Sequence, residues 1–528
     1  MHVRVKFPHA PAETTISSRD KCRRQGIVNM YIPSQRTDGP KKLTRILAGE
    51  LFDPYTCKVV KNKLITVSQD SGLVIDVDSF NDLQGHGIAR DSDVIDLRKE
   101  TVLPGLVDVH VHFFLHPYSE VSWEDQVTRE SLAERTIRAV AHAKRTLMAG
   151  YTAVRDLGTE GAEDADIALR KCLSGPNPIV PGPRYFIANR AIVTSGSYGT
   201  WFIPKEDNKL YPNRNGVEGI MGAEVADGEL ECKRAVRRQI GAGADWIKVR
   251  PSPSLLLKVR RLKFPEDYRA RACTQDVDPD TARRSFSTFS QGELEAMTSE
   301  AHSLGVKVAA HASTAASWKR LHSLIDPVDT IEHGYEIGEL FEKGVSESSP
   351  PENRPLLSGR RITWVPTLAT YYTLGQNSGQ WEKAAKSFKT VLANSKPEEL
   401  AIACGGDTGV FAHGDNALEL KVMVRLGADW RTVLRWATLG GWECIRSLRW
   451  EGQTGLDRLN RVEELGEDAK IVGDNEVPFG AIRKGFAADI IATNGDLEKD
   501  FERAVDRENI RFVMKGGRVY KLDGKELA

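Results

Sequence analysis

The chain has 528 residues, of which 40% are apolar and 28% are charged. This balance is typical of a globular protein and excludes a disordered, collagen-like or membrane-embedded chain. Lys and Arg together number 73, as do Asp and Glu, so the formal net charge is zero. Because a neutral chain has no global field to hold nucleic acid or an anionic bilayer, we expect neither as a partner. The function must therefore come from a local site.

Seven cysteines are scattered along the chain and never form a Cys-x-x-Cys pair. An odd number without this spacing argues against a disulfide framework or a zinc ribbon and favours reduced thiols. Residues 1–42 form a polar, basic leader without the apolar core of a signal peptide. No window reaches the roughly 18 apolar residues of a membrane span. We therefore expect a cytoplasmic protein.

Residues 43–103 consist of short apolar runs separated by turn residues, a pattern that predicts β-strands. Strand texture returns at the other end of the chain, in residues 489–492 and 510–520. We therefore expect residues 43–103 and 477–528 to build one small β-sandwich domain from both chain ends.

Residues 104–476 alternate short apolar runs with longer helical patterns, which predicts parallel strands with crossover helices. Eight strand candidates occur, at residues 106–111, 152–156, 184–188, 246–249, 307–310, 330–332, 364–366 and 402–405. Eight such units predict an α/β fold, a (β/α)8 TIM-like barrel of about 250 residues before insertions. Three segments fit this pattern poorly and are expected to be surface insertions: residues 255–287, 345–361 and 452–476.

The strongest local signal is Leu106-Val-Asp-Val-His-Val-His, where an apolar strand ends in His110 and His112. Residues i and i+2 of a strand share one face, so both imidazoles can point at one cation. In a parallel barrel the active site lies at this carboxyl end of the strands. For an isolated pair, two histidines in a polar turn would be the favoured interpretation. Asp108 shares the face of His110, where a hydrogen bond to that ligand and a polar contact in the barrel core are both open.

Four other residues at predicted strand ends favour a metal site over two histidines in a polar turn: Lys248, His311, His333 and Asp407. Lys248 differs from the others because an ammonium group has no lone pair. It becomes a ligand only if burial lowers its pKa and carbon dioxide carboxylates the neutral amine, giving an anionic group that bridges two ions. The alternative is a lysine that extends to solvent or forms an ion pair.

Together with their flanking motifs, these residues resemble the metal-dependent amidohydrolase superfamily, in particular its Xaa-Pro dipeptidase, imidazolonepropionase and ochratoxinase-like branch. The resemblance covers residues 43–522. The motifs that carry it are Val102-Leu-Pro-Gly-Leu-Val-Asp-Val-His-Val-His, Gly243-Ala-Asp-Trp-Ile-Lys-Val, Phe411-Ala-His-Gly-Asp-Asn, Gly480-Ala-Ile-Arg-Lys-Gly-Phe-Ala-Ala-Asp-Ile and Val513-Met-Lys-Gly-Gly-Arg-Val-Tyr.

The resemblance implies two Zn²⁺ ions, or another divalent metal, in each chain. By this likeness His110, His112 and Asp407 hold one ion, His311 and His333 hold the other, and a carboxylated Lys248 bridges them. Two cations about 3.5 to 4 Å apart can share a hydroxide that is nucleophilic at neutral pH. Asp407 would be the catalytic acid–base that moves its proton to the leaving nitrogen. The implied activity is hydrolysis of an amide bond in an N-acyl amino acid, an Xaa-Pro-type dipeptide or an ochratoxin-like amide.

The chain departs from the family pattern at positions where the resemblance implies contact with the substrate. Where relatives carry a Gly-Gly-His-Gly type loop, this chain has Thr194-Ser-Gly-Ser-Tyr-Gly-Thr, so Tyr198 replaces a possible substrate-contacting imidazole. Arg250 stands where a small, glycine-rich turn is usual; it could bind a substrate carboxylate with two hydrogen bonds or form a surface ion pair. His413 lies in a loop expected to overhang the site, where it lines the pocket or is solvated. Superfamily members often assemble as dimers to octamers, so the resemblance also implies a homo-oligomer.

Two other functions stay open. One is hydrolysis of a cyclic C–N bond, as in imidazolonepropionase-like or deaminase relatives. Deaminases of the superfamily generally use one metal and lack the carboxylated lysine, so Lys248 favours the amidase. The other is a catalytically silent binding barrel. The complete set of six polar residues argues against it, because such residues are costly to bury around a cavity.

Overall fold

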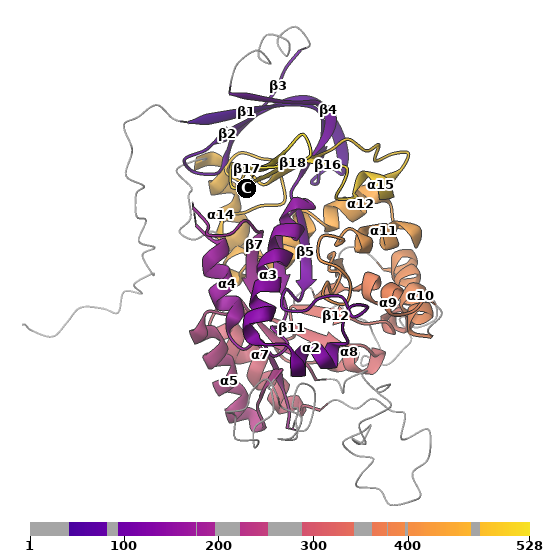
Figure 1. Ribbon diagram of the computed structural model, residues 1–528. Coiled ribbons are helices and arrows are strands. Elements are labelled where there is room, and N and C mark those ends of the chain that lie inside the picture. The colour runs from indigo at the N-terminus through magenta and orange to yellow at the C-terminus, as the bar shows by residue number, and fades with distance from the viewer. Residues whose placement is uncertain are drawn as a thin grey trace, which may run out of the picture. The chain divides into compact units, whose positions relative to one another are not determined.

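The computed structural model describes residues 42–81, 93–175, 177–195, 222–251, 288–342, 362–376, 379–395, 400–465 and 476–527. Within these ranges the chain has an α/β fold, as predicted (Figure 1). Except for Lys42, the predicted leader lies outside the described residues, as do the predicted insertions at residues 255–287 and 345–361.

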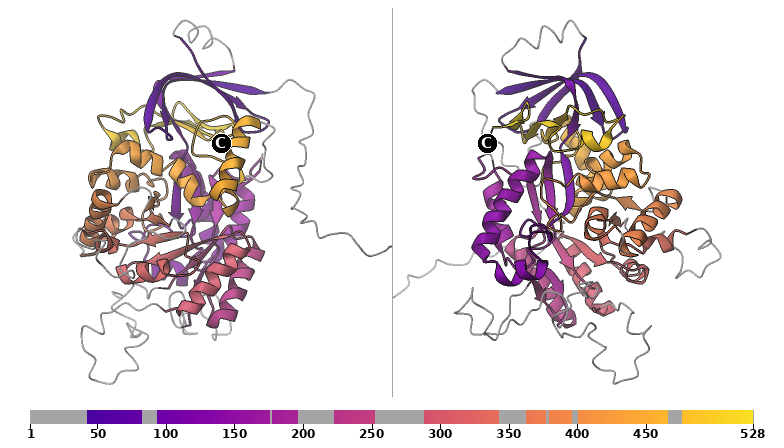
Figure 2. Two further views of the ribbon diagram at one scale, coloured as in Figure 1. Left: turned by 180° about the vertical axis from the view of Figure 1, so that it is seen from behind. Right: turned by 45° about the vertical axis from the view of Figure 1, so that its right-hand side comes forward.

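One sheet joins strands from both ends of the chain, drawn in indigo and yellow in Figure 2. It has eight strands in the order β18-β17-β16-β15-β4-β1-β2-β3. Its strands are β1 (Leu43–Asp53), β2 (Lys58–Ser68), β3 (Val74–Ser79), β4 (Val94–Pro104), β15 (Ile490–Thr493), β16 (Ile510–Lys515), β17 (Arg518–Leu522) and β18 (Lys525–Glu526). The two halves meet where β15 pairs antiparallel with β4, with Ile490 opposite Pro104. Alternate residues of these strands, such as Ile46 and Ala48 in β1, pack into a shared apolar core.

Two sheets of parallel strands follow, one of order β14-β13-β12-β11-β10-β8-β9 and one of order β5-β6-β7. The strands are β5 (Leu106–Val111), β6 (Tyr151–Asp156), β7 (Arg184–Ile187), β8 (Ala191–Val193), β9 (Ala223–Val225), β10 (Trp246–Val249), β11 (Lys307–Ala312), β12 (Thr330–His333), β13 (Thr363–Val365) and β14 (Ala401–Ile402). Each of the eight predicted strands overlaps one of these. The short strands β8 and β9 were not predicted.

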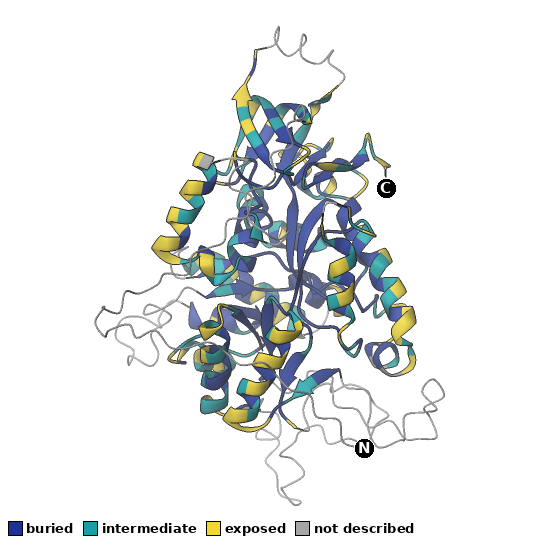
Figure 3. Cartoon of the chain, turned by 90° about the vertical axis from the view of Figure 1, so that its left-hand side faces the viewer, coloured by how far each residue is buried: buried dark blue, intermediate teal, exposed yellow. Residues whose placement is uncertain are grey.

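Helices cover the parallel strands, which are buried on both faces (Figure 3). The α-helices are α2 (Trp123–Arg129), α3 (Leu132–Met148), α4 (Ala165–Leu173), α5 (Gly228–Ala242), α7 (Gln291–Ser303), α8 (Ala315–His322), α9 (Leu368–Leu374), α10 (Gly379–Asn394), α11 (Leu418–Arg425), α12 (Trp430–Trp436), α13 (Leu439–Ile445), α14 (Gly452–Leu465) and α15 (Phe501–Ala504). Strands buried on both faces leave no solvated side for a polar residue unless it has a partner.

The segment predicted as a surface insertion at residues 452–476 begins with the helix α14. Val462 of this helix packs in a core cluster with Trp450, and Leu459 lies against the same cluster. Their spacing of three residues places them on one face of a helix. The many charged residues around them concealed this apolar face in the sequence.

The sequence predicts reduced cysteines and no membrane-spanning segment, and both predictions concern residues in the described part of the chain. None of the helices there is long and apolar enough to cross a bilayer. Five of the seven cysteines lie in it, and all five are free thiols, in agreement with the predicted reduced state: Cys57, Cys172, Cys232, Cys404 and Cys444.

His302, near the end of α7, forms hydrogen bonds with two carboxylates of the segment that precedes β12 in the chain. Its Nδ1 lies 2.5 Å from Asp326 Oδ2 and its Nε2 lies 2.8 Å from Asp329 Oδ2. Asp329 also accepts a 2.8 Å hydrogen bond from the backbone N–H of Val308 in β11. Burial by itself lowers the pKa of His302, but the two carboxylates raise it above its usual value.

We expect the change His302→Gln to reduce the free energy of unfolding by about 1 to 3 kcal/mol at acidic pH, because bonds to charged groups are lost. The folded-state pKa is raised, so this stabilisation is fully present below the unfolded value of about 6.5 and is lost as the pH rises through the folded-state pKa. Urea denaturation of both proteins at about pH 5.5 and about pH 9 measures the effect. The difference between the two proteins should be larger at the lower pH, and an equal difference would contradict a protonated His302.

Candidate metal centre

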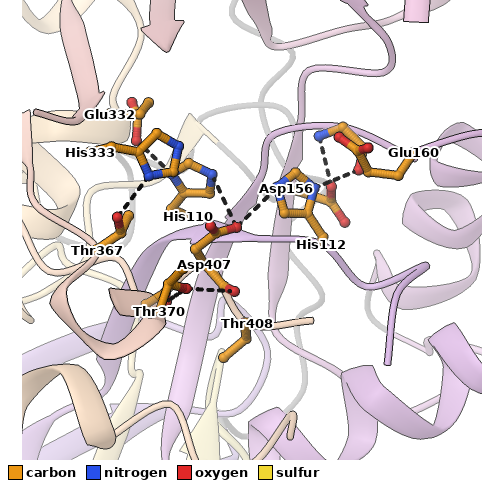
Figure 4. Close-up of polar contacts among 12 residues, drawn as sticks. His110, His112, Asp156, Glu160, Glu332, His333, Thr367, Thr370, Asp407 and Thr408 are labelled. Carbon is orange, nitrogen blue, oxygen red and sulfur yellow. Dashed lines mark hydrogen bonds and ion pairs between the residues drawn. The ribbon is translucent and has the colours of Figure 1, made fainter. Parts of the chain in front are cut away.

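All six residues predicted as metal ligands lie at the carboxyl ends of parallel strands and are buried. They come from five parts of the chain: His110 and His112 from β5, Lys248 from β10, His311 from β11, His333 from the end of β12, and Asp407 from the segment after β14. Figure 4 shows His110, His112, His333 and Asp407 turned towards one another.

Asp407 reaches the histidines because the segment after β14 runs directly against β5. The backbone N–H of Asp407 donates to the carbonyl of His110, and that of His112 donates to the carbonyl of Thr408, both at 2.8 Å. Gly405 permits this approach, since a Cβ at that position would lie only 2.8 Å from the Cβ of His110.

Asp108 holds the same two segments together. Its carboxylate accepts hydrogen bonds from the backbone N–H of His110 at 3.0 Å and of Gly406 at 3.1 Å, and from the side-chain amide of Asn416 at 2.8 Å. Burial raises the pKa of Asp108 to about 7 against the effect of these bonds. Asp108 thus contacts the backbone of His110 and not its ring.

Ligand atoms of His110, His333 and Asp407 lie within 4.8 Å of one another, a spacing that could hold a metal ion. Asp407 Oδ1 is 3.6 Å from His110 Nε2 and 3.3 Å from His112 Nε2. The ring of His311 lies beside that of His333, with centroids 4.3 Å apart. Five of the six predicted ligands therefore form one cluster of adjoining side chains.

Three of the histidines have Nδ1 bonded outside the cluster, which directs Nε2 towards it. These contacts are each 2.8 Å long, from His110 to Glu332 Oε2, from His112 to the carbonyl of Gly158 and from His333 to Thr367 Oγ1. A carbonyl oxygen can only accept, so His112 carries a proton on Nδ1, and the lone pair of its neutral form lies on Nε2. That lone pair is the form in which imidazole binds a cation.

The Nζ of Lys248 is buried and has no hydrogen-bond partner in the described residues, and its charge lowers the pKa of His110, His311 and His333, after the larger effect of burial. Burial is the main cause that lowers the pKa of Lys248 to about 8; the charges of Arg155 and Arg250 lower it further, and that of Glu332 opposes them. A lowered pKa enlarges the neutral fraction of the amine at neutral pH. This fraction is the form that carbon dioxide can carboxylate.

Asp407 and His112 show strong and opposite pKa shifts. Burial by itself raises the pKa of Asp407, but the charges of His110 and His112 lower it well below its usual range. For His112, burial lowers the pKa, whereas the hydrogen bond and charge of Asp407 raise it to about 9. The carboxylate of Asp407 thus lies beside a positively charged His112. A divalent cation bound between the two side chains could replace the proton of His112 as the positive partner.

Glu332 also contacts the cluster, although it was not predicted as a site residue. Alternation along a regular strand would place Glu332 and His333 on opposite faces. The backbone of His333 leaves the extended conformation, with φ of +74°, and both side chains approach His110. The available signal was an acidic residue in a strand predicted to be buried, because such a carboxylate requires a partner.

The three predicted substrate contacts have different surroundings. Tyr198 lies outside the described residues. Arg250 follows β10 directly, is half-buried, and its charge lowers the pKa of both Lys248 and His311, after the larger effect of burial. His413 is buried; its Nε2 donates to the carbonyl of Leu115 at 3.0 Å, and its ring stacks on His142. Contact of these residues with a substrate stays a prediction.

Comparison with known proteins gives consistent matches. The model of the amidohydrolase family matches residues 101–447. The ochratoxinase of Aspergillus niger is 24% identical over 538 residues, which covers 98% of this chain and 95% of that protein. A Xaa-Pro dipeptidase structure with bound methionine has a TM-score of 0.63 at 24% identity, covering 91% of this chain and 100% of the other. The A. niger ochratoxinase structure has a TM-score of 0.62 at 21% identity, covering 92% and 96%.

The change Gly405→Ala tests the close approach between β5 and the segment that carries Asp407. The new methyl group would lie 2.6 Å from Val365 Cγ1 and 2.8 Å from His110 Cβ, so we expect a loss of about 1 to 3 kcal/mol in the free energy of unfolding. Displacement of Asp407 should also lower the metal content of the purified protein. Gly241→Ala on α5 is the matched control, because nothing lies within 4 Å of its added Cβ. Urea denaturation and metal analysis measure both effects, and wild-type values for Gly405→Ala would contradict the packing argument.

Proposed function

The chain belongs to the amidohydrolase family, and on that basis we propose that it is a binuclear zinc enzyme that hydrolyses an amide bond. The observation that carries the proposal is the convergence of His110, His333 and Asp407 within 4.8 Å. The proposed substrates are N-acyl amino acids, Xaa-Pro-type dipeptides and ochratoxin-like amides. The likeness to an ochratoxinase and to a Xaa-Pro dipeptidase supports this substrate class.

The same proposal includes a closed (β/α)8 barrel formed by the two parallel sheets. Backbone contacts between their edges support closure. Val109 of β5 donates to the carbonyl of Cys404 beyond β14, at 3.0 Å, and Asp245 before β10 donates to Ile187 of β7, at 2.8 Å. In this arrangement residues 104–476 form the barrel domain, and residues 43–103 and 477–528 form a β-sandwich domain.

The donor set fits two divalent cations. His110, His112 and Asp407 would hold one, His311 and His333 would hold the other, and a carboxylated Lys248 would lie between them. The buried Nζ without a partner and the histidine Nε2 atoms directed at Asp407 support this assignment. When bound, the two cations would lower the pKa of a water molecule towards neutrality and polarise the scissile carbonyl.

Asp407 is the residue that moves the proton. The charges of His110 and His112 keep the carboxylate ionised at neutral pH, so its oxygens are available to a proton from the attacking water. It then passes the proton to the departing nitrogen, because an unprotonated amide nitrogen is a poor leaving group. The contacts of Asp407 Oδ1 with His110 and His112 orient the carboxylate for both transfers.

Arg250 is proposed to recognise the substrate. Dipeptides and N-acyl amino acids carry a carboxylate close to the scissile amide, and a guanidinium group can hold it with two parallel hydrogen bonds. Arg250 follows the strand of Lys248, and its charge acts on Lys248 and His311. Arg250 is therefore close enough to the cluster for its charge to act on two of the predicted ligands. Tyr198 is proposed as a further contact.

The change Asp407→Asn tests this mechanism. An amide is a poor proton acceptor, so we expect hydrolysis to fall by about 10² to 10⁴-fold, while the zinc content stays close to that of the wild type, near two ions per chain. Metal analysis and turnover of a panel of N-acyl amino acids and Xaa-Pro dipeptides provide the measurement. A retained rate would remove Asp407 from its role. Turnover of cyclic C–N substrates alone, or of none with both ions bound, would favour a ring hydrolase or a binding protein.

The change Lys248→Ala tests the bridging role. We expect loss of bound zinc and of activity, because the anionic group between the two ions is missing, with partial recovery when a short carboxylic acid such as acetate is added. Lys521→Ala is the matched control. Lys521 is also buried, but its Nζ donates to the carbonyls of Met148 and Arg507. Its loss should lower stability without an effect of acetate on activity. Full activity of Lys248→Ala would contradict the bridge.

A further inference from the structure

A buried ion pair lies directly behind His110. Arg155 of β6 and Glu332 of β12 form an ion pair in which Nη2 lies 2.8 Å from Oε1, and both side chains have 0% exposure. Arg155 also donates from Nε to the carbonyl of Val109 at 2.7 Å and from Nη1 to Thr330 Oγ1 at 3.1 Å. Its guanidinium group lies 4.3 Å from the ring centre of Trp246. Side chains and backbone of three other strands thus hold the guanidinium in one place.

Glu332 uses its two oxygens in different directions. Oε1 accepts from Arg155 and from the hydroxyl of Thr330. Oε2 accepts from His110 Nδ1 at 2.8 Å. A carboxylate bonded in this way fixes the plane of the imidazole ring and keeps the proton on Nδ1, so the lone pair of Nε2 faces Asp407.

The contact of His110 Nδ1 differs from the Nδ1 contacts of His112 and His333 in the same cluster. His112 donates to a backbone carbonyl, and His333 contacts the hydroxyl of Thr367. Both partners are neutral groups. A carboxylate partner raises the basicity of the opposite nitrogen more than a neutral acceptor does, and it makes the imidazole a stronger metal ligand.

We propose that Arg155 and Glu332 are positioning residues that hold His110 as the strongest histidine ligand of the metal centre. Arg155 orients Glu332, and Glu332 orients the ring of His110 and sets its tautomer. This inference rests on the proposed function, because it requires that His110 binds a cation. It extends that function to two residues that touch neither the cation nor the substrate.

The fold offers a matched control in a second buried ion pair. Arg184 Nε lies 2.7 Å from Asp489 Oδ2, and the two side chains are 3% and 0% exposed. Arg184 is the first residue of β7, whereas the predicted ligands lie at the opposite, carboxyl ends of the strands. Asp489→Asn therefore neutralises a carboxylate of equal burial with the same type of partner, away from the cluster.

The experiment compares Glu332→Gln with Asp489→Asn in the full-length chain, using Co²⁺ and Zn²⁺ as probes. Competition with a chelator measures the affinity of each ion, and the visible absorption spectrum of the Co²⁺ protein reports the ligand environment. We expect Glu332→Gln to weaken binding about 10- to 100-fold and to change the spectrum, since partners of ligating histidines have effects of this size. Asp489→Asn should lower thermal stability while the affinity and the spectrum stay as in the wild type.

Each outcome has one meaning. If folded Glu332→Gln binds both ions with wild-type affinity and spectrum, the positioning role is wrong, although the proposed function stands. If the wild-type chain itself binds neither ion, the proposed function fails. Should Glu332→Gln not fold, Glu332→Asp keeps the charge beside Arg155 and withdraws the carboxylate from His110 by one methylene group. An unchanged Co²⁺ spectrum in that variant would overturn the inference as well.

Discussion

The burial of ionisable side chains at the carboxyl ends of the parallel strands is the constraint on which the site depends. A charge that is removed from water is stable only beside an opposite charge or hydrogen-bond donors. Asp407 meets this requirement through His110 and His112, and Glu332 meets it through Arg155 and His110. Lys248 has no such hydrogen bond in the described chain. No hydrogen bond from the described residues therefore holds the amine of Lys248, which makes it a candidate for chemical modification.

β5 takes part both in the packing of the strands and in the cluster of polar side chains. Its backbone bonds to the segment after β14 on one side, and to Arg155 of β6 through the carbonyl of Val109. Its side chains supply His110 and His112. A change in the position of β5 would alter the distances of Asp407 and Glu332 from these histidines together. The geometry of the cluster therefore depends on strand packing as much as on the ligands themselves.

The sequence was sufficient to predict the α/β class, the eight parallel strands and the residues of the cluster, because apolar runs and polar strand ends are local patterns. It was not sufficient for Glu332, because regular alternation would place it on the face opposite to His333, and only the unusual backbone of His333 brings both side chains to His110. Arg155 was missed for a related reason, since its four partners come from distant parts of the chain. α14 was missed because charged residues surround its apolar positions. Contacts between distant segments and local backbone deviations have no periodic signal.

Three of the nine described non-glycine residues with positive φ lie at this cluster. His333, Thr367 and Asp407 have φ values of +74°, +49° and +59°, in the left-handed region that residues with a side chain rarely adopt. Each such residue costs on the order of 1 to 3 kcal/mol and persists only when its surroundings determine it. The bond between His333 Nδ1 and Thr367 Oγ1, and that from the backbone N–H of Asp407 to His110, are two of these determinants. Contacts within the fold itself therefore hold these side chains in place.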